Sequence, residues 1–114
     1  LLVFGCGGDR DRGKRREMGQ IAGELADLTY LTSDNPRSED PARILADISA
    51  GVPTRSESIA EVDREMAIAL ALAEAEEGDI VVIAGKGHEN FQILKGKEIE
   101  FNDLTILNEL KDVI

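Results

Sequence analysis

Short apolar segments alternate with longer amphipathic segments along this chain of 114 residues. The most apolar of them, Ile80-Val81-Val82-Ile83-Ala84, is rich in β-branched residues and is flanked by Gly-Asp and Gly-Lys-Gly, which is typical of a strand. Because its apolar residues are continuous, we expect this strand to be buried on both faces, in a parallel sheet covered by helices. The segment therefore points to the α/β fold class.

The remaining segments fit the same architecture. Further strands are predicted at residues 1–4 and 28–32, and a hairpin at residues 91–94 and 98–101. Residues 51–59 are predicted as a loop with one short strand. Helices are predicted around residues 18–25, from Asp40-Pro41 to Gly51, from Val62 to Gly78, and over residues 104–110. We expect a single domain over residues 1–114, a three-layer Rossmann-like α/β sheet that is mostly parallel and carries a C-terminal hairpin.

Helical spacing also predicts which side chains face the core. The predicted core residues are Met18, Ile21, Ala22 and Leu25 in the first helix, Ile44, Leu45 and Ile48 in the second, and Val62, Met66, Ala69, Leu70 and Ala73 in the third, with Ile68 and Leu72 widening the stripe. Asp40 is expected to cap the second helix, with Pro41 at its first position.

The charge balance excludes several classes of protein. Thirteen Lys and Arg against twenty-three Asp and Glu give a net charge of −10, whereas a general nucleic-acid binder needs an excess of positive charge. Only 4% of the residues are aromatic and none is Trp, which argues against a base-stacking platform. Residues 1–16 nevertheless hold five basic and two acidic side chains. A small basic region in an otherwise acidic protein suits the binding of a small anion. The alternative is that these basic side chains lie at the solvent-exposed start of a helix.

Cysteine usage and hydropathy narrow the possibilities further. The single cysteine, Cys6, excludes an internal disulfide and a Cys-rich zinc site and fits a reducing compartment. We expect it to be a small residue at the edge of the core and not a nucleophile. No apolar run approaches the roughly 18 to 20 residues of a membrane span, and there is no signal-peptide pattern. Because the chain opens on an apolar run without an initiator Met, we expect it to be a piece of a longer protein.

Three predicted strands end in loops whose residues are suited to binding a ligand, at residues 5–16, 33–37 and 85–89. In an open α/β sheet, ligands gather at the carboxyl ends of the strands. We therefore expect the three loops to converge on one edge of the sheet and to form the binding site there.

The first loop matches the spacing of a phosphate-binding P-loop over residues 8–15, but Arg15 stands where such a loop needs Ser or Thr to bind magnesium. Charged spacer residues, two of them acidic, would also crowd a phosphate. The loop is therefore not predicted to bind a nucleotide by itself. Arg10 is able to hold a carboxylate or phosphate bidentately, and a structural ion pair with Asp9 or Asp11 is the alternative.

The second loop contains Asp34-Asn35-Pro36-Arg37. Pro36 fixes its own φ, Asn35 offers a donor and an acceptor, and Arg37 offers a planar cationic fork. This combination suits the zwitterionic head of an amino acid. A plain β-turn is the alternative, and the commoner one for these four residues taken alone.

The third loop is Gly85-Lys86-Gly87-His88-Glu89. Its glycines allow backbone groups to approach a ligand closely, and Glu89 is able to accept a hydrogen bond from an ammonium group. His88 is the only histidine, which excludes a His-based metal cluster. We expect its side chain to have a structural role or to be exposed to solvent.

In combination, the three loops resemble the motifs of the Mur ligase family. Residues 3–11 with Gly13-Lys14-Arg15 are similar to the signature of the family's C-terminal domain, residues 34–37 to its diaminopimelate-recognition motif, and residues 85–89 to its third block. Their order and wide separation over nearly the whole chain make chance agreement improbable. One departure is Arg16, which stands where members of the family often have proline.

The resemblance implies a role for each matching residue. Arg10 would bind a carboxylate of an incoming amino acid, while Asn35 and Arg37 would bind its distal head. The Gly85 carbonyl and the Glu89 carboxylate would hold the distal ammonium group.

The same resemblance implies that Asp34 and Pro36 shape their loop. Lysine-adding members of the family typically lack an arginine at the position of Arg37, so this residue favours diaminopimelate over lysine. No catalytic residue and no metal ligand is expected within this chain.

The resemblance also implies a reaction. The related ligases work in the cytoplasm, in peptidoglycan biosynthesis, and add meso-2,6-diaminopimelate to UDP-N-acetylmuramoyl-L-alanyl-D-glutamate through an acyl phosphate. ATP and Mg²⁺ would be bound mainly by a central ATPase domain, and the UDP group by an N-terminal domain, both of which this chain lacks. The 114 residues alone are therefore expected to be inactive.

Other functions are compatible with the same residues. One is a stand-alone module that binds an amino acid or a small anion, and another is the lysine-adding homologue. A flavodoxin-like signalling domain ranks lower, because the sequence has no acidic cluster at the end of the first strand. Neither a nucleic acid nor a membrane is expected as a partner.

Overall fold

The computed structural model describes residues 1–86, 89, 91–94 and 97–110. Its main sheet is parallel, with the strand order β3-β2-β1-β4. The strands of this sheet are β1 (Leu2–Phe4), β2 (Thr29–Leu31), β3 (Ser58–Ala60) and β4 (Val82–Ile83). The strands predicted at residues 1–4 and 28–32 and the short strand near residue 59 are thereby confirmed.

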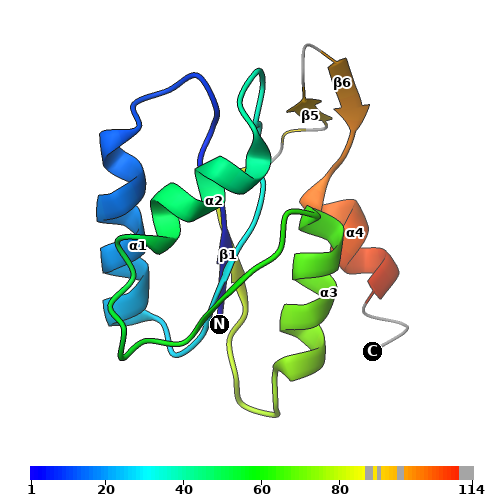
Figure 1. Cartoon of the computed structure of the whole chain (residues 1–114). Helices are drawn as coiled ribbons and strands as arrows, with labels where there is room; N and C mark the ends of the chain where they lie inside the picture. The colour runs from blue at the N-terminus through cyan, green and yellow to red at the C-terminus, as the bar shows by residue number, and fades with distance from the viewer. Residues whose placement is uncertain (87–88, 90, 95–96, 111–114) are drawn as a thin grey trace.

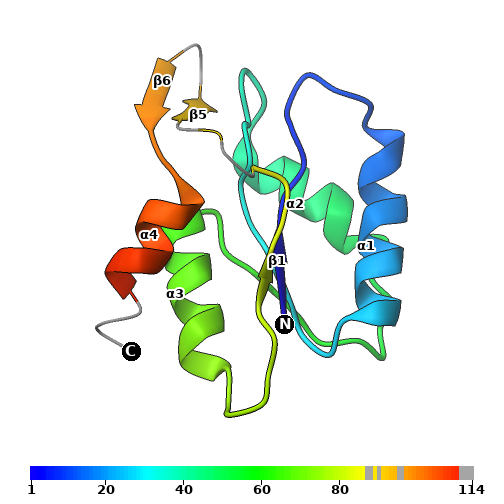
Figure 2. The same ribbon diagram turned by 180° about the vertical axis from the view of Figure 1, so that it is seen from behind.

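Four helices cover the two faces of this sheet, α1 (Gly13–Leu25), α2 (Pro41–Ser49), α3 (Arg64–Glu74) and α4 (Asp103–Leu110). Helices α1 and α2 lie on one side of β1, and α3 and α4 lie on the other (Figures 1 and 2). The predicted hairpin forms from β5 (Phe91–Leu94) and β6 (Lys97–Glu100), which pair antiparallel in a sheet of their own. The three-layer α/β architecture is confirmed.

The core is divided by the sheet into two clusters. Successive residues of a strand point to opposite faces, so Phe4 packs with α1 and α2 while Val3 packs with α3. The first cluster contains Phe4, Ala22, Leu31, Ile44, Leu45 and Ile48. The second contains Val3, Tyr30, Ala67, Ile68 and Ala71.

Aspartates cap the second and third helices. The Asp40 side chain accepts a hydrogen bond from the Ala42 backbone N–H, and Pro41 occupies the first turn of α2, as predicted. Asp63 caps α3 by accepting from the Met66 backbone N–H. Because each cap satisfies an amide that the helix cannot, these two aspartates fix where α2 and α3 begin.

The prediction that residues 80–84 form a strand buried on both faces is wrong. Only Val82 and Ile83 are in β4, and the side chains of Ile80 and Val82 are 76% and 49% exposed. In the described part of the chain β4 pairs only with β1, at the edge of the sheet. Val81 and Ile83 pack against the cluster beneath α3, but no described element covers the opposite face of β4.

The predicted core faces of α1 and α3 are also partly wrong. Met18, Ile21 and Leu25 are 40%, 56% and 82% exposed, because α1 contacts α2 through smaller residues. A Cβ atom at Gly19 would overlap the Ile48 carbonyl oxygen, so glycine permits this close approach.

In helix α3, too, some of the large apolar side chains that were predicted to be buried are exposed. Its buried residues are Arg64, Ala67, Ile68 and Ala71, whereas Met66 and Leu70 are 48% and 39% exposed. The helix also ends at Glu74 rather than reaching Gly78, and Val62 precedes it. None of the helices in the described residues is both long enough and apolar enough to cross a lipid bilayer.

Candidate functional site

The loops that follow β1, β2 and β4 meet at the carboxyl ends of the strands (Figure 1). The Gly8 backbone N–H donates to the Asn35 carbonyl at 2.7 Å. The Asn35 side chain in turn donates from Nδ2 to Glu89 Oε1 at 3.4 Å. The predicted convergence of the three loops is therefore observed.

The first two loops approach each other so closely that only glycine fits between them. A Cβ atom at Gly8 would overlap the Pro36 carbonyl oxygen. The glycine-rich sequence after β1 thus has a steric cause, and it allows residues 34–37 to rest against the backbone of the first loop.

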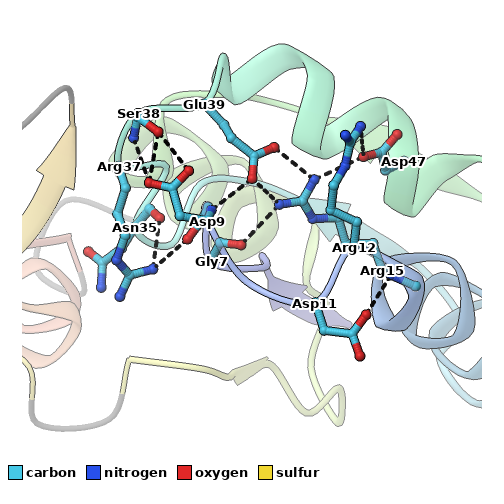
Figure 3. Close-up of polar contacts among 12 residues, drawn as sticks. Gly7, Asp9, Asp11, Arg12, Arg15, Asn35, Arg37, Ser38, Glu39 and Asp47 are labelled. Carbon is cyan, nitrogen blue, oxygen red and sulfur yellow. Dashed lines mark hydrogen bonds and ion pairs between the residues drawn. The ribbon is translucent and has the colours of Figure 1, made fainter.

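Arg37 points into this junction. Its Nη1 donates to the Gly8 carbonyl at 3.0 Å and to the Asn35 carbonyl at 3.4 Å, and the residue is half-buried (Figure 3). Its backbone has a φ of 54°, a conformation that costs non-glycine residues of the order of 1–3 kcal/mol. Within the described residues, Nε and Nη2 form no hydrogen bond, so these N–H groups are available to an anion.

Arg10 does not form the structural ion pair considered as its alternative role. Asp9 accepts hydrogen bonds from the Ser38 hydroxyl at 2.6 Å and the Ser38 backbone N–H at 3.3 Å, and Asp11 accepts from the Gly13 N–H at 2.9 Å. In the described part of the chain neither carboxylate pairs with Arg10, which is exposed.

A cleft of about 440 Å³ lies between the first loop and the ends of β2 and β4. Its lining residues are Gly5, Cys6, Gly7, Arg10, Asp11, Lys14, Met18, Asp34 and Gly85. Gly85 has a φ of 109°, a conformation that favours glycine. The cleft thus collects charges of both signs, as the recognition of a zwitterion requires.

Lys86 is a site residue to which the sequence assigned no role. Its side chain is buried, forms an ion pair with Asp34 Oδ1 at 3.2 Å and donates to Asn35 Oδ1 at 3.0 Å. This contact directs the Asn35 amide so that its nitrogen faces Glu89. The only signal in the sequence was a lysine between two glycines, which gives no indication of burial.

Arg15 is a second residue whose role the sequence did not reveal. It is buried and donates to both Glu39 oxygens at 2.8 and 3.0 Å, to Asp47 Oδ2 at 2.9 Å and to the Gly7 carbonyl at 3.2 Å (Figure 3). It therefore ties the first loop to α2 and to the segment that leads into α2.

Residues 1–87, which are most of the chain, match the family described as Mur ligase, glutamate ligase domain. The chain belongs to the Mur ligase family. The family predicted from the three loops is confirmed.

Several relatives of this Mur ligase domain carry the name UDP-N-acetylmuramoyl-L-alanyl-D-glutamate--2,6-diaminopimelate ligase. The protein of Prochlorococcus marinus (strain MIT 9313) is 60% identical over 101 residues, which are 89% of this chain and 20% of that protein. The protein of Gloeobacter violaceus is 60% identical over 103 residues, or 90% of this chain and 21% of that protein. The chain spans about a fifth of the length of the curated relatives it matches.

A solved structure of a ligase with the same name superposes with a TM-score of 0.93 at 48% sequence identity. The match covers 98% of this chain and 23% of that structure. Almost the whole of this Mur ligase domain therefore has the same fold as the corresponding part of that enzyme.

The first loop of this Mur ligase domain does not have the hydroxyl residue with which a P-loop binds magnesium. Arg15, in the position of the P-loop hydroxyl residue, forms ion pairs with Glu39 and Asp47 through its two Nη atoms. Among the described residues, no group of three or more His, Cys, Asp or Glu side chains is arranged to hold a metal ion.

Cys6 and His88 were the other residues with potential chemistry. Cys6 is half-buried, with its Sγ 3.5 Å from Met18 Sδ, and it packs against the core. Burial, opposed by Arg15 and assisted by Asp34, raises the pKa of its thiol, so the thiolate is disfavoured. His88 and Gly87 lie outside the described residues.

The Arg15–Glu39 pair predicts how stability depends on pH. Hydrogen bonds from Arg15, and then from the Asp9 N–H, lower the pKa of Glu39 from 4.5 to about 2. The pair therefore stabilises the folded chain above pH 4.5, and this contribution is lost as the pH falls towards 2. We expect Glu39→Gln to lower the free energy of unfolding at pH 7 by about 1–3 kcal/mol and to have progressively less effect below pH 4.5. Urea unfolding at pH 7 and pH 3 measures both values.

The matched control for this experiment is Glu17→Gln, because Glu17 is exposed on α1. It should leave the unfolding free energy nearly unchanged at both values of pH. An effect of Glu39→Gln that is equally large at pH 7 and at pH 3 would contradict the ion-pair explanation.

Proposed function

We propose that this chain is the C-terminal, amino-acid-binding domain of a ligase that adds meso-2,6-diaminopimelate to UDP-N-acetylmuramoyl-L-alanyl-D-glutamate in peptidoglycan biosynthesis. The observation that carries the proposal is the meeting of three loops that hold an unpaired guanidinium edge on Arg37, the Glu89 carboxylate and the exposed Arg10. The name shared by the relatives agrees with it. We propose that this chain is part of a longer protein, and we call that protein the full-length ligase.

The charges of the site suit a molecule with two amino-acid heads. The distal head of diaminopimelate carries a carboxylate and an ammonium group on one carbon. Arg37 and Asn35 would bind that carboxylate, while Glu89 and the Gly85 carbonyl would bind the ammonium group. Arg10, on the other side of the first loop, would bind the proximal carboxylate.

The buried side chain of Lys86 supports this arrangement by holding Asp34 and Asn35 in place. Because its ammonium group holds Asp34 and the Asn35 amide oxygen, the Asn35 nitrogen remains directed towards the ligand side. Asp34 and Pro36 thereby shape the loop, as the family resemblance implies, without contacting the reacting atoms.

In the proposed reaction, the proximal amine of diaminopimelate attacks an activated carboxyl carbon of the D-glutamate residue. A C–N bond forms, the activating phosphate leaves with the electrons of the C–O bond, and the amine loses a proton. The residues of this chain contribute by placing the amine, and positioning of this kind supplies a large share of catalysis in two-substrate reactions. We place the binding of ATP and Mg²⁺ outside this chain, because Arg15 fills the position that such a site would need. We place the enzyme in the cytoplasm, where ATP and UDP-linked precursors are available.

The test is substrate selectivity of the full-length ligase. Phosphate release should require UDP-N-acetylmuramoyl-L-alanyl-D-glutamate and meso-2,6-diaminopimelate together. Replacing diaminopimelate by lysine, which lacks the distal carboxylate, should lower kcat/KM at least about tenfold, as expected for one lost charged hydrogen bond. Equal or faster turnover with lysine would identify the enzyme as the lysine-adding homologue instead.

A further inference from the structure

Arg64, the first residue of α3, is a buried arginine beneath the proposed site. It is 1% exposed, and its Nε and Nη2 donate to the two carboxylate oxygens of Asp103, each at 2.8 Å. Asp103 is the first residue of α4 and is 6% exposed. The bidentate pair therefore joins the starts of α3 and α4, which lie side by side at the end of the sheet where the three loops gather (Figures 1 and 2).

The same guanidinium also holds the ends of two strands. Nη1 donates to the Ser33 carbonyl at 3.0 Å, and Nη2 donates to the Ala84 carbonyl at 3.3 Å. Ser33 immediately precedes Asp34, and Ala84 immediately precedes Gly85. Strands β2 and β4 are separated by β1 in the sheet, so they share no ladder hydrogen bonds, and Arg64 bridges their ends directly.

The start of α4 reaches the third loop as well. Asn102 accepts a hydrogen bond from the Thr105 N–H at 3.0 Å, which caps the helix, and its Nδ2 donates to the Glu89 carbonyl at 3.4 Å. Through Asp103 and Asn102, one helix start is thus connected to Arg64 on one side and to the backbone of Glu89 on the other.

We propose that Arg64 and Asp103 are a positioning pair for the amino-acid site, and that they set the separation between the loop at residues 34–37 and the loop at residues 85–89. This inference rests on the proposed function. The distal carboxylate and ammonium of the substrate share one carbon atom, so the groups that bind them must stay at a fixed distance. An error of about 1 Å in such an arrangement costs on the order of 100-fold in rate.

Stability alone does not account for the pair. Well-packed apolar residues stabilise a protein core as well as a buried ion pair does, or better. An apolar side chain at residue 64 would, however, leave the Ser33 and Ala84 carbonyls without the donor that holds them together. The arrangement of four acceptors around one guanidinium is therefore explained by the geometry of the loops it joins.

Arg64→Lys in the full-length ligase tests the proposal, because lysine retains the charge but not the planar fork that reaches several acceptors at once. We expect the KM for diaminopimelate to rise about tenfold or more, as for the loss of one or two charged hydrogen bonds. The KM values for ATP and for the UDP-linked substrate should stay within about twofold, since those groups bind elsewhere. Asp103→Asn, which preserves shape, should shift the KM for diaminopimelate in the same direction.

The matched control is Ile68→Ala, a buried substitution one turn further along α3. It removes core packing and lowers stability by roughly 2–5 kcal/mol, but it should leave the KM for diaminopimelate unchanged. If Arg64→Lys and Asp103→Asn alter the three KM values equally, or not at all, the positioning role is excluded while the proposed function stands. If the wild-type enzyme does not use diaminopimelate, the proposed function fails and the positioning role fails with it.

Discussion

Arg37→Lys in the full-length ligase is expected to raise the KM for diaminopimelate roughly 30- to 100-fold, with a smaller effect on kcat. Charged hydrogen bonds contribute about 1.5–3 kcal/mol each, and each 1.4 kcal/mol corresponds to about a tenfold change in affinity. In the structure, Nη1 of Arg37 is held by the Gly8 and Asn35 carbonyls, so the opposite edge of the guanidinium is fixed for a carboxylate. A lysine ammonium cannot bind the two carbonyls and present a second, bidentate edge at the same time.

Steady-state kinetics with diaminopimelate and with lysine as competing substrates measure this effect. Selectivity for diaminopimelate should fall, because the variant loses the group that distinguishes the two. Arg43→Lys, on the exposed surface of α2, is the control and should behave as the wild type. Unchanged use of diaminopimelate by the Arg37 variant would refute the assignment of Arg37 to the distal carboxylate.

The isolated 114-residue chain is expected to show no ligase turnover, even with both substrates, ATP and Mg²⁺ present. The residues that we propose for binding converge in this chain, but the P-loop-like segment has its eighth position occupied by Arg15, which is paired with Glu39 and Asp47. Without activation of the carboxyl group, a bound amine has nothing to attack.

A coupled phosphate-release assay compares the isolated chain with the full-length ligase at equal concentration. Far-UV circular dichroism establishes first that the isolated chain is folded. Diaminopimelate-dependent phosphate release by the isolated chain would show that the activation site lies within these 114 residues, and it would overturn our placement of ATP binding.

The order of the elements and the meeting of the three loops were predictable from the sequence, because both depend on where the strands lie and strands have local signals. Strand 28–32 follows from its β-branched and aromatic residues, and the start of α2 follows from Asp40-Pro41. The convergence of the loops follows from a general property of parallel sheets, once the strands that precede the loops are recognised.

The contacts that hold the site together were not predictable in the same way. Lys86 meets Asn35 across 51 residues of sequence, and Arg64 meets Asp103 across 39. Such pairs arise only when the chain is folded, and charged residues are most often exposed, so no local pattern indicated that these would be buried.

The errors in the predicted core faces have a related cause. Helical spacing locates large apolar residues such as Ile21 and Met66, but the face that a helix buries against a neighbouring helix or sheet is decided by where the backbones approach most closely. In α1 that place is Gly19, and in α3 it is marked by Ala67 and Ala71. Small residues give little hydrophobic signal, so the sequence indicates the helical period but not the rotation of the helix about its axis.

The uncovered side of β4 has a practical consequence for work on the isolated polypeptide. Met18, Ile21 and Leu25 on α1 line one hollow beside Ala84, and Leu25 also lines a second hollow with Ile80 and Val82. All five of these large residues are substantially exposed. Soluble monomers rarely expose large contiguous apolar patches to water. An unpaired edge strand can also form hydrogen bonds with a strand of a second molecule. We therefore expect preparations of these 114 residues to aggregate as they are concentrated. Salting-out agents such as sulfate should accelerate precipitation.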